Sequence, residues 1–600
     1  MPMTPELRQK VDRIRDDLFG GGYPDPVSNA EQLAFLFFFY LIEGIDKQNA
    51  ARARVLKQDY TSLFAGEWTL RNPLNAPNKG ETAIPAERLR WSLWARGLSG
   101  ENLVRFVRDE VFPFFADVAA DSAVNFMDGA RLGIDDPAVL SKLVTDVDGL
   151  RLDEADADTK GDLFEHVLRQ IKQAGELGQF RTPRHIIRAI VEMVNPQIAE
   201  TIYDPAAGTA GFLAAAYNHI RLANSSEAAI ETVESDGKPQ RRGLGDTLNQ
   251  AQQSQLANRT FYGNDVDPKM VRLATMNLTL RGLPNVRILR RNALTSTLDV
   301  QQRADLGLPD AYDVVLANPP FSGRVDRDRI VEDVKVGNTG ATEILFLKYM
   351  LDSLKPDGRC GVIVPEGVLF GSTGAHKEIR RLLVENNSVE AVLSFPGGVF
   401  QPYSGVKTST LFFRKGGNTE RVLFLHADND GYKLDANHDQ PIEADDLPGL
   451  IEVFRSRDDR WAEWQASLPS PLAGEGARRA DEGRAPNAPA QWTKNWWFAT
   501  AETLRSNDYN LSASRYRPLN AAQVEHRDPR ELLDELAALE AEIASEVEAL
   551  RAAGLVVRTV WQSSLLDLDD LPFEPSRLPP VFTTFRQALE GAGVQPREPV

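Results

Sequence analysis

The first 155 residues show apolar positions spaced three and four apart, as in Glu101–Ala119 (ENLVRFVRDEVFPFFADVA). This spacing places the apolar side chains on one face of a helix. The longest unbroken apolar run, Leu33–Ile42 (LAFLFFFYLI), is far shorter than the roughly 20 residues that cross a bilayer. It predicts a buried helix and no membrane span. Residues 1–155 are therefore predicted to form an N-terminal, all-helical domain.

Between residues 156 and 420, strand-like segments alternate with helical patterns. The expected strands are, in chain order, ETIYDPAAG (200–208), RTFYGNDVD (259–267), NVRILRRNA (285–293), YDVVLANPP (312–320), RCGVIVPEG (359–367), VEAVLSF (389–395) and KTSTLFFRK (407–415). This alternation is typical of an α/β fold with a Rossmann-like, doubly wound and mostly parallel sheet. The last strand is expected to join the sheet edge antiparallel. The polar residues 222–255 are expected to form an inserted surface loop.

The pattern weakens after residue 420. Residues 421–466 are assigned to the end of the α/β domain and its connector, and 467–491, rich in Pro, Gly and Ala, to a low-complexity linker. Residues 492–555 are predicted to be a C-terminal helical extension, in which the helix 529–553 carries leucines at heptad-like spacing. This helix either packs on its own domain or pairs with a partner subunit, and the spacing leaves both open. Residues 556–600 are a tail to which the pattern assigns no role.

Charge and composition narrow the functional classes. The net charge is −18 and the isoelectric point is near 5.1. Since neutralised phosphates supply most non-specific affinity for nucleic acid, a broad DNA-gripping surface is disfavoured, although a local basic cleft or a basic partner fits the charge. The single cysteine, Cys360, and a charged N-terminal segment without an apolar signal core indicate a cytoplasmic protein.

Metal chemistry is not predicted. The seven histidines show neither HExxH nor paired Cys/His spacing. The segment Asp428–Gly431 (DNDG) faintly resembles a calcium loop, but the later ligands of such a loop are missing. We therefore interpret it as a turn and expect no metal ligand.

Three segments carry candidate chemistry. The segment Asp204–Leu213 (DPAAGTAGFL) follows the first predicted strand with small residues, which permit a tight turn and a close approach of a ligand to the backbone. Asp265 ends the next strand, where an acid can accept hydrogen bonds from both hydroxyls of a ribose. A later strand ends in Asn318-Pro319-Pro320-Phe321, whose prolines fix the backbone and donate no hydrogen bond. An isolated Asn-Pro is usually only a turn, but this ordered set is far more specific.

These motifs resemble those of the modification (M) subunit of type I restriction–modification systems, an adenine-N6 DNA methyltransferase family. Asn318-Pro319-Pro320-Phe321 is similar to its catalytic (D/N)PP(Y/F) motif, and DPAAGTAGFL to its first cofactor motif. The upstream segment GQFRTP resembles the stretch that closes over the cofactor methionine. The cofactor-binding residues that the resemblance implies are Gln179, Phe180, Arg181, Thr182, Pro183, Arg184, Asp204, Ala206, Gly208, Thr209, Ala210, Gly211, Asp265 and Asn292.

Some positions depart from the family pattern. Arg181 stands where many relatives have an aromatic residue, and Asn292 where the family often has an Asp that contacts the cofactor's adenine ring. Ala207 and Ala210 replace residues that are often Cys or Gly. None of these changes removes the expected chemistry, but the first two bear on cofactor affinity.

The resemblance implies transfer of a methyl group from S-adenosyl-L-methionine to N6 of an adenine that has left the duplex. The Asn318 side-chain oxygen and the Pro319 carbonyl would each accept one N6–H bond and aim the nitrogen lone pair at the cofactor methyl. Phe321 would stack on the base. The reaction needs alignment and no metal, because the sulfonium methyl is already activated.

The expected partners are double-stranded DNA, a DNA-specificity (S) subunit, a second M subunit and a restriction (R) subunit. A separate specificity subunit is expected because no large basic recognition domain follows the catalytic motif and the chain is acidic. Two alternatives remain open at this point: the same chemistry on RNA or on a protein glutamine, and a cofactor-binding assembly subunit without activity.

Overall fold

The computed structural model describes residues 5–23, 25–57, 59–120, 126–152, 157–169, 182–321, 323–400, 406–435, 438, 440–468 and 492–518. The chain divides into two compact units, residues 1–520 and 521–600, and all described residues belong to the first. The predicted helix 529–553 and the tail lie outside the described residues. So do nearly all of the linker 467–491 and the site residues Gln179, Phe180 and Arg181.

The N-terminal region is mainly helical, as predicted, with one short hairpin that the helical pattern did not indicate. Its elements are α1 (Pro5–Gly20), α2 (Pro26–Leu56), β1 (Glu67–Thr69), η1 (Pro73–Asn75), β2 (Ala83–Pro85), η2 (Ala86–Leu89), α3 (Trp91–Gly97), α4 (Gly100–Phe106), the π-helical turn η3 (Val107–Val111), α5 (Phe112–Ala120), α6 (Pro137–Asp148) and α7 (Ala157–Arg169). Every residue of Leu33–Ile42 is buried within α2. Phe39 of this run stacks on Phe115 with ring centroids 4.6 Å apart. The run is therefore the centre of an aromatic core.

The α/β region is built on a nine-stranded sheet in the order β15-β12-β10-β11-β9-β8-β3-β6-β7. Its strands are β3 (Ile202–Asp204), β6 (Phe261–Asp265), β7 (Arg287–Arg290), β8 (Tyr312–Ala317), β9 (Leu354–Pro365), β10 (Ser388–Ser394), β11 (Thr408–Arg414), β12 (Arg421–His426) and β15 (Trp496–Thr500). Neighbouring strands are parallel except around β11 and β15, which run antiparallel to their neighbours. All seven predicted strands are present, and the predicted fold class is confirmed.

The structure corrects the position of the last predicted strand. β11 is antiparallel, but it lies inside the sheet, hydrogen-bonded to β9 on one side and β10 on the other. Its burial explains why: Thr408 to Phe413 are all buried, which an edge strand with a solvated side would not show. β12 and β15, which were not predicted, extend the sheet beyond β10.

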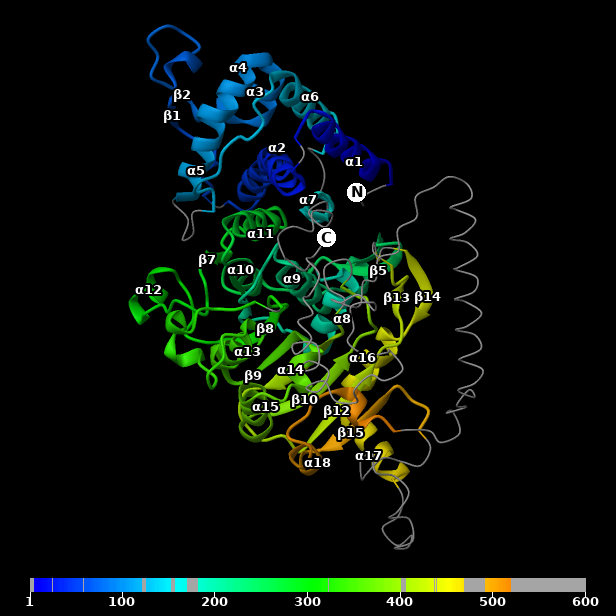
Figure 1. The fold of residues 1–600 in the computed structure, drawn as a ribbon. Helices are drawn as coiled ribbons and strands as arrows, with labels where there is room; N and C mark the ends of the chain where they lie inside the picture. The colour runs from blue at the N-terminus through cyan, green and yellow to red at the C-terminus, as the bar shows by residue number, and fades with distance from the viewer. Residues whose placement is uncertain are drawn as a thin grey trace, which may run out of the picture. The chain divides into compact units, whose positions relative to one another are not determined.

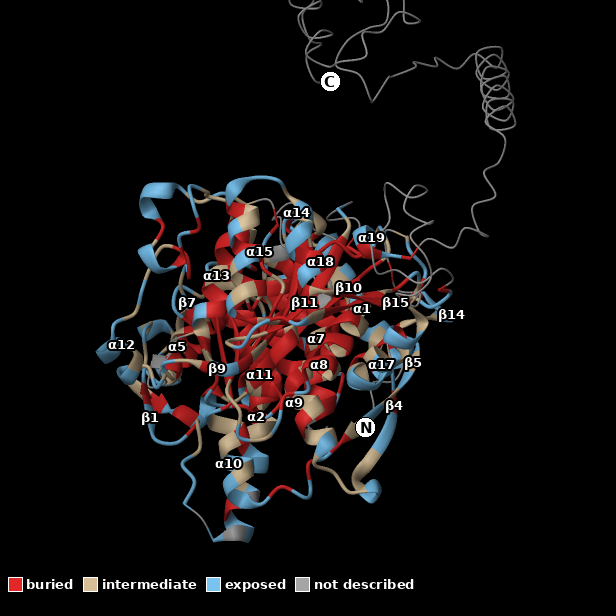
Figure 2. Cartoon of the chain, turned by 90° about the horizontal axis from the view of Figure 1, so that it is seen from below, coloured by how far each residue is buried: buried red, intermediate tan, exposed pale blue. Residues whose placement is uncertain are grey.

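Helices surround the sheet. They are α8 (Arg184–Val194), α9 (Gly211–Ala223), α10 (Gln250–Asn258), α11 (Pro268–Leu280), α12 (Val300–Asp305), α13 (Thr342–Ser353), α14 (Glu366–Phe370), α15 (Gly374–Asn386), α16 (Leu447–Arg455), α17 (Arg457–Ser467), α18 (Ala501–Ser506) and α19 (Ala513–Tyr516), with 3₁₀ turns η5 (Glu227–Ala229), η6 (Arg327–Arg329) and η7 (Glu332–Val334). Figure 2 shows the buried residues concentrated on the strands and on the inner faces of these helices. No helix in the described part of the chain combines the length and apolar character of a membrane span.

The polar insertion 222–255 is not a simple loop. It contains the hairpin of β4 (Ile230–Ser235) and β5 (Lys238–Gly243), in which Ser235 pairs with Lys238. Asp236 and Gly237 link the strands with φ of 56° and 74°, and positive φ at both positions is the geometry of the tight turns that suit hairpins. A second hairpin, β13 (Asp430–Tyr432) with β14 (Pro441–Asp445), follows β12.

The N-terminal helices pack on the α/β region through α11. Figure 1 shows α2 and α7 beside α11, and residue contacts join α11 to both. Met270 and Leu273 of α11 belong to the N-terminal core, whereas Val271 and Ala274 belong to the core around the sheet. Across this boundary the Arg272 guanidinium donates to the carboxylate of Glu31 at 2.6 Å and to the Asp128 carbonyl at 3.1 Å.

Candidate active site

The first predicted site segment forms a strand-to-helix turn. β3 ends at Asp204, a fully buried residue whose Oδ1 accepts a hydrogen bond from the amide of Ala206 at 3.0 Å. Gly208 and Ala210 have φ of 51° and 64°, and Ala210 is the N-terminal cap of α9. Glycine adopts this left-handed conformation without strain because it has no Cβ, whereas Ala210 adopts it at some cost. The backbone of the turn is thus kept free of bulk.

Asp265 lies against this turn. β6 is parallel to β3, with Asp204 opposite Gly263. Asp265 Oδ2 accepts from the Gly208 amide at 3.0 Å, and Oδ1 accepts from the Asp267 amide at 2.9 Å. The strands approach closely because Gly263 has no Cβ: one placed there would lie 3.0 Å from the Asp204 carbonyl oxygen.

The carboxyl groups of Asp204 and Asp265 at this edge both have raised pKa values. Burial raises the pKa of Asp204 to about 8, and the nearby charge of Asp265 adds to this, against the lowering effect of the Ala206 amide. Burial also raises the pKa of Asp265. A cationic or hydrogen-bond-donating ligand at this edge would stabilise both carboxylates.

The second part of the site is the end of β8. Tyr203 of β3 pairs with Val315 of β8, so that Asn318 emerges at the same carboxyl edge of the sheet as Asp204. The Asn318 side-chain nitrogen donates to the Thr182 hydroxyl at 2.9 Å. Its oxygen, Oδ1, is buried and has no hydrogen-bond partner among the described residues. A buried acceptor without a donor is costly, and such an atom points to a ligand that supplies one.

Phe321 is packed, contrary to the picture of an open stacking surface. Only 7% of its surface is exposed, and its ring lies edge-to-face against Phe400 with centroids 6.1 Å apart. Of the two prolines, Pro319 is buried and Pro320 is exposed, and the Pro320 carbonyl accepts from the Thr342 hydroxyl at 3.2 Å. In this conformation the Phe321 ring is therefore part of the packed interior and offers no open face to a base.

The remaining predicted residues differ in their positions. Thr182 and Pro183 lead into α8, with Pro183 as its N-terminal cap. Asn292 is exposed, and its Oδ1 accepts from the Leu294 amide at 3.0 Å, so that it stabilises the turn after β7. Arg184 is ion-paired with Glu165 at 2.6 Å. Arg184 thus faces α7 and is separate from the group formed by Asp204, Asp265 and Asn318.

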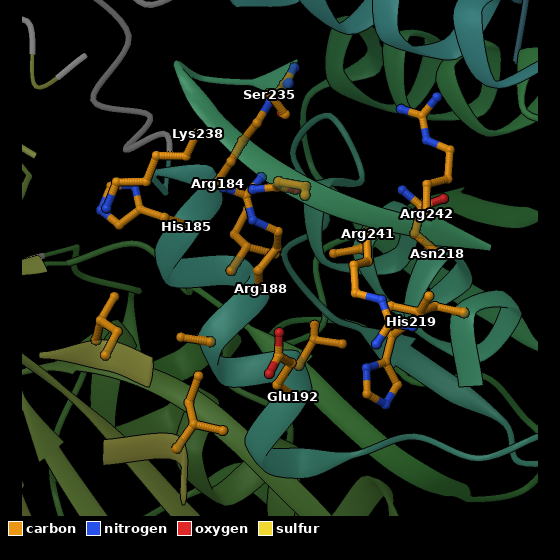
Figure 3. Close-up of a pocket in the computed structure, with 18 of the residues that line it drawn as sticks. Arg184, His185, Arg188, Glu192, Asn218, His219, Ser235, Lys238, Arg241 and Arg242 are labelled. Carbon is orange, nitrogen blue, oxygen red and sulfur yellow. The ribbon is translucent and has the colours of Figure 1, made fainter. Parts of the chain in front are cut away.

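Arg184 and Gly211 line a cavity of about 640 Å³ bounded by α8, α9, the hairpin β4–β5 and α16 (Figure 3). The cavity has a mixed charged wall, in which basic residues outnumber acidic ones; the basic side chains are Arg184, Arg188, Lys238, Arg241, Arg242 and Arg455. Asp204, Asp265 and Asn318 are not part of its lining. It is therefore a neighbour of the candidate active site and not the site itself.

Several residues that support the candidate active site were not predicted from the sequence. Tyr203, which precedes Asp204, donates to Asn264 at 3.0 Å, lies 2.8 Å from the Tyr349 hydroxyl and stacks on Tyr312 at 4.2 Å. This buried tyrosine cluster packs directly behind the strand ends that carry Asp204 and Asp265. Its members belong to three separate segments, and only the apolar strand pattern around Tyr203 and Tyr312 was visible in the sequence.

The strand order, the turn after β3, the acid at the end of β6 and Asn-Pro-Pro-Phe after β8 form the arrangement that the sequence resemblance implies for a methyltransferase of amino groups. Residues 155–526 match the family model described as N-6 DNA Methylase, and the chain belongs to that family. The predicted family and the predicted activity, methylation of adenine N6 in DNA, are confirmed. The two alternatives, methylation of RNA or a protein glutamine and an inactive cofactor-binding assembly subunit, are not favoured.

Similar proteins are methylase subunits of type I restriction enzymes. The chain is 29% identical over 492 residues to the EcoEI methylase subunit of Escherichia coli, which covers 78% of this chain and 85% of that subunit. It is 28% identical over 393 residues to the EcoKI methylase subunit of Escherichia coli (strain K12), covering 64% and 66%. Among solved structures, a modification subunit of a putative type I restriction enzyme from Vibrio vulnificus YJ016 superimposes with a TM-score of 0.62 at 21% identity, covering 88% of this chain and 99% of that one. A chain from a structural study of type I R-M complex assembly and conformational transition has a TM-score of 0.57 at 25% identity, covering 92% and 98%.

Proposed function

We propose that this DNA methyltransferase acts as the modification subunit of a type I restriction–modification complex, with Asn318, Pro319, Pro320 and Phe321 as its catalytic motif. The observation that supports this assignment is the buried Asn318 Oδ1, which lacks a donor in the described structure and lies at the carboxyl edge beside the Asp204 turn. An adenine amino group would supply the missing donor.

The chemistry follows from the geometry of the amide. Adenine N6 is a weak nucleophile because its lone pair is delocalised into the ring. Thr182 binds the nitrogen of the Asn318 amide, which leaves the oxygen available to accept an N6–H. The Pro319 carbonyl would accept the second N6–H from a backbone that proline holds rigid. The nitrogen lone pair is then aligned for in-line attack, and this alignment is the contribution of the protein.

The same edge fits the cofactor. The turn from Ala206 through Thr209 to Gly211 would accept the cofactor against its backbone, with Asp265 binding the ribose hydroxyls: each of its oxygens accepts one amide and retains a second lone pair. Asp204, buried with a raised pKa, would be stabilised by the cationic amino-acid end of the cofactor. S-adenosylmethionine supplies the activated methyl group. Gln179, Phe180, Arg181, Thr182 and Pro183 remain proposed as the segment that covers it, and Asn292 as a contact to its adenine ring.

The proposed partners are double-stranded DNA, a specificity subunit, a second modification subunit and a restriction subunit, in the cytoplasm. The similarity to named type I methylase subunits supports these partners. So does the charge of −18, because an acidic chain gains little from phosphate neutralisation and needs a partner to read DNA.

Methyl transfer from labelled S-adenosylmethionine to unmethylated genomic DNA, measured with and without co-purified partners and followed by detection of N6-methyladenine, tests the proposal. Asn318→Ala is expected to abolish transfer and to keep cofactor binding, which isothermal titration measures independently. Asn285→Ala, at an exposed asparagine before β7, is the matched control and should retain activity. Wild-type transfer rates in Asn318→Ala would contradict the assignment of Asn318.

A further inference from the structure

Three side chains distant in the sequence meet at one point: His185 on α8, Asp430 at the start of β13, and His438 after β13. His185 Nε2 lies 2.9 Å from Asp430 Oδ2, and His438 Nε2 lies 2.9 Å from the same oxygen. All three ligand atoms lie within 4.8 Å of one another. This cluster, the His–Asp–His cluster, has no part in the methyl-transfer site described above.

The cluster is buried and aromatic on one side. The side chains of Asp430 and His438 are 0% and 1% exposed, and that of His185 is 12% exposed. The His185 ring stacks on Tyr432 with centroids 4.3 Å apart. The Lys238 ammonium lies 4.9 Å from the centroid of the same tyrosine ring. Figure 3 shows His185 and Lys238 at the same end of the cavity, so that one edge of the cluster is open to it.

The partners of the two ring nitrogens of His438 give the strongest argument for a bound cation. Its Nδ1 lies 3.2 Å from the Val399 carbonyl oxygen and its Nε2 faces the Asp430 carboxylate, so that both ring nitrogens face acceptors. A neutral imidazole has one N–H and can satisfy only one of them. If Nδ1–H donates to the Val399 carbonyl, Nε2 presents its lone pair toward the Asp430 carboxylate, and these two groups can bind a cation together. Metal-bound histidines usually have this arrangement, in which the other ring nitrogen donates to a carbonyl.

We propose that His185, Asp430 and His438 form a binding site for one divalent first-row transition metal, such as zinc, with water from the cavity completing the coordination. Two imidazoles and a carboxylate suit these metals. Ligand atoms around zinc lie about 3.3 Å apart when each bond is about 2.0–2.1 Å long. The observed separations of 2.9 Å therefore need to open by only a few tenths of an ångström. Arg188, three residues after His185 on α8, is 3.7 Å from Asp236, which offsets its charge.

The position of the cluster defines its role. His185 lies on the first turn of α8, which follows Thr182, the partner of Asn318. Val399, whose carbonyl faces His438, precedes Phe400, which packs on Phe321. A metal here would fix together the two segments that contact the Asn-Pro-Pro-Phe motif. The site is structural and stands independently of the proposed chemistry.

The test uses the full chain, without a polyhistidine tag, purified from zinc-supplemented medium in buffers free of chelator. Elemental analysis is expected to find about one metal ion per chain. Asp430→Asn and His438→Gln should lose most of it. His219→Gln is the matched control: His219 lines the same cavity, binds Asn195 at 2.8 Å and lies outside the cluster. It should retain the metal.

A second measurement covers variants that fail to fold. The wild-type chain is stripped with EDTA and then titrated with cobalt(II), whose visible d–d bands report coordination by nitrogen and oxygen. Bands that saturate at about one equivalent, together with a thermal shift on re-addition of zinc, are the expected result. Less than a tenth of an equivalent of metal after purification and no saturable cobalt bands would overturn the proposal and leave a buried imidazolium–carboxylate pair.

Discussion

Asn318 and Thr182 are joined by a hydrogen bond of 2.9 Å from the asparagine amide nitrogen to the threonine hydroxyl. Thr182 precedes α8 and is itself 6% exposed, so that its hydroxyl is held by the packed helix terminus. In this arrangement Oδ1 is left as the free acceptor. Thr182 is thus a positioning residue for the proposed catalytic asparagine.

Thr182→Val is expected to lower kcat for methyl transfer about tenfold to a hundredfold, because it leaves the buried Asn318 amide nitrogen without an acceptor at a cost of about 1–3 kcal/mol. Thr182→Ser, which keeps the hydroxyl, should stay within about threefold of the wild type, since the same hydrogen bond can form. Steady-state kinetics with varied cofactor separate kcat from KM. A fall confined to KM for the cofactor would show that Thr182 acts on cofactor binding and not on Asn318.

The raised pKa of Asp204 predicts a pH-dependent stability. The folded-state pKa of about 8 lies above the ordinary value of 3.8, so that the folded chain binds a proton that the unfolded chain releases. The stability of the cofactor-free wild type should therefore fall as the pH rises from about 4 to about 8 and level off above that, at up to about 1.4 kcal/mol per pH unit.

Asp204→Asn removes this titration and keeps an acceptor for the Ala206 amide. Its stability advantage over the wild type should be smallest at the acidic end of the range and should grow toward pH 8, as measured by urea unfolding at a series of pH values. Equal pH dependence in the two proteins would show that Asp204 ionises normally in the folded chain.

The ion pair between Arg272 and Glu31 is buried, with each side chain 8% exposed. Arg272→Met leaves the Glu31 carboxylate buried and unpaired and is expected to cost about 3–5 kcal/mol, whereas Arg272→Met combined with Glu31→Leu should recover much of this loss. The measurement is the free energy of unfolding by guanidinium chloride. Arg505→Met, which breaks the more exposed pair with Glu385, should cost less than about 1 kcal/mol. Additive single-variant losses would argue against coupling between the two residues.

Gly361 allows α8 to lie directly on β9. A Cβ at this position would be 2.7 Å from Val194 Cγ2 and 2.9 Å from Ile190 Cγ2. Gly361→Ala is expected to destabilise the chain by about 1–3 kcal/mol through overpacking. Gly374→Ala, where no described heavy atom lies within 4 Å of the added Cβ, is the control and should be neutral or slightly stabilising in a thermal melt. An unchanged melting temperature for Gly361→Ala would mean that α8 shifts freely on the sheet.

Local patterns predicted much of this fold. The seven predicted strands and the buried run Leu33–Ile42 follow from apolar periodicity, and the site turn follows from its small residues. The place of β11 inside the sheet did not follow, because strand order depends on which edges meet in three dimensions. The Asp236–Gly237 turn was a readable hairpin signal within the polar insertion, but the surrounding Gly, Ser and Gln residues obscured it.

Part of the candidate site could be predicted from the positions of strand ends. Asp204, Asp265 and Asn318 end neighbouring parallel strands, and strand ends meet at one edge of the sheet. The contact between Thr182 and Asn318 spans 136 positions and the contact between His185 and Asp430 spans 245, so that no spacing rule detects them. Asp430 was interpreted as a turn residue because the sequence does not show that two histidines approach it.

The two sides of α11 pack into different hydrophobic cores. Met276 and Leu280 belong to the core around α2, whereas Leu278 belongs to the core around the sheet. A helix divided in this way cannot keep one partner and lose the other without exposing a strip of apolar side chains to water. The amino-terminal helices and the sheet should therefore melt in a single transition. A fragment cut to begin at α8 would be an insoluble product and not a minimal enzyme.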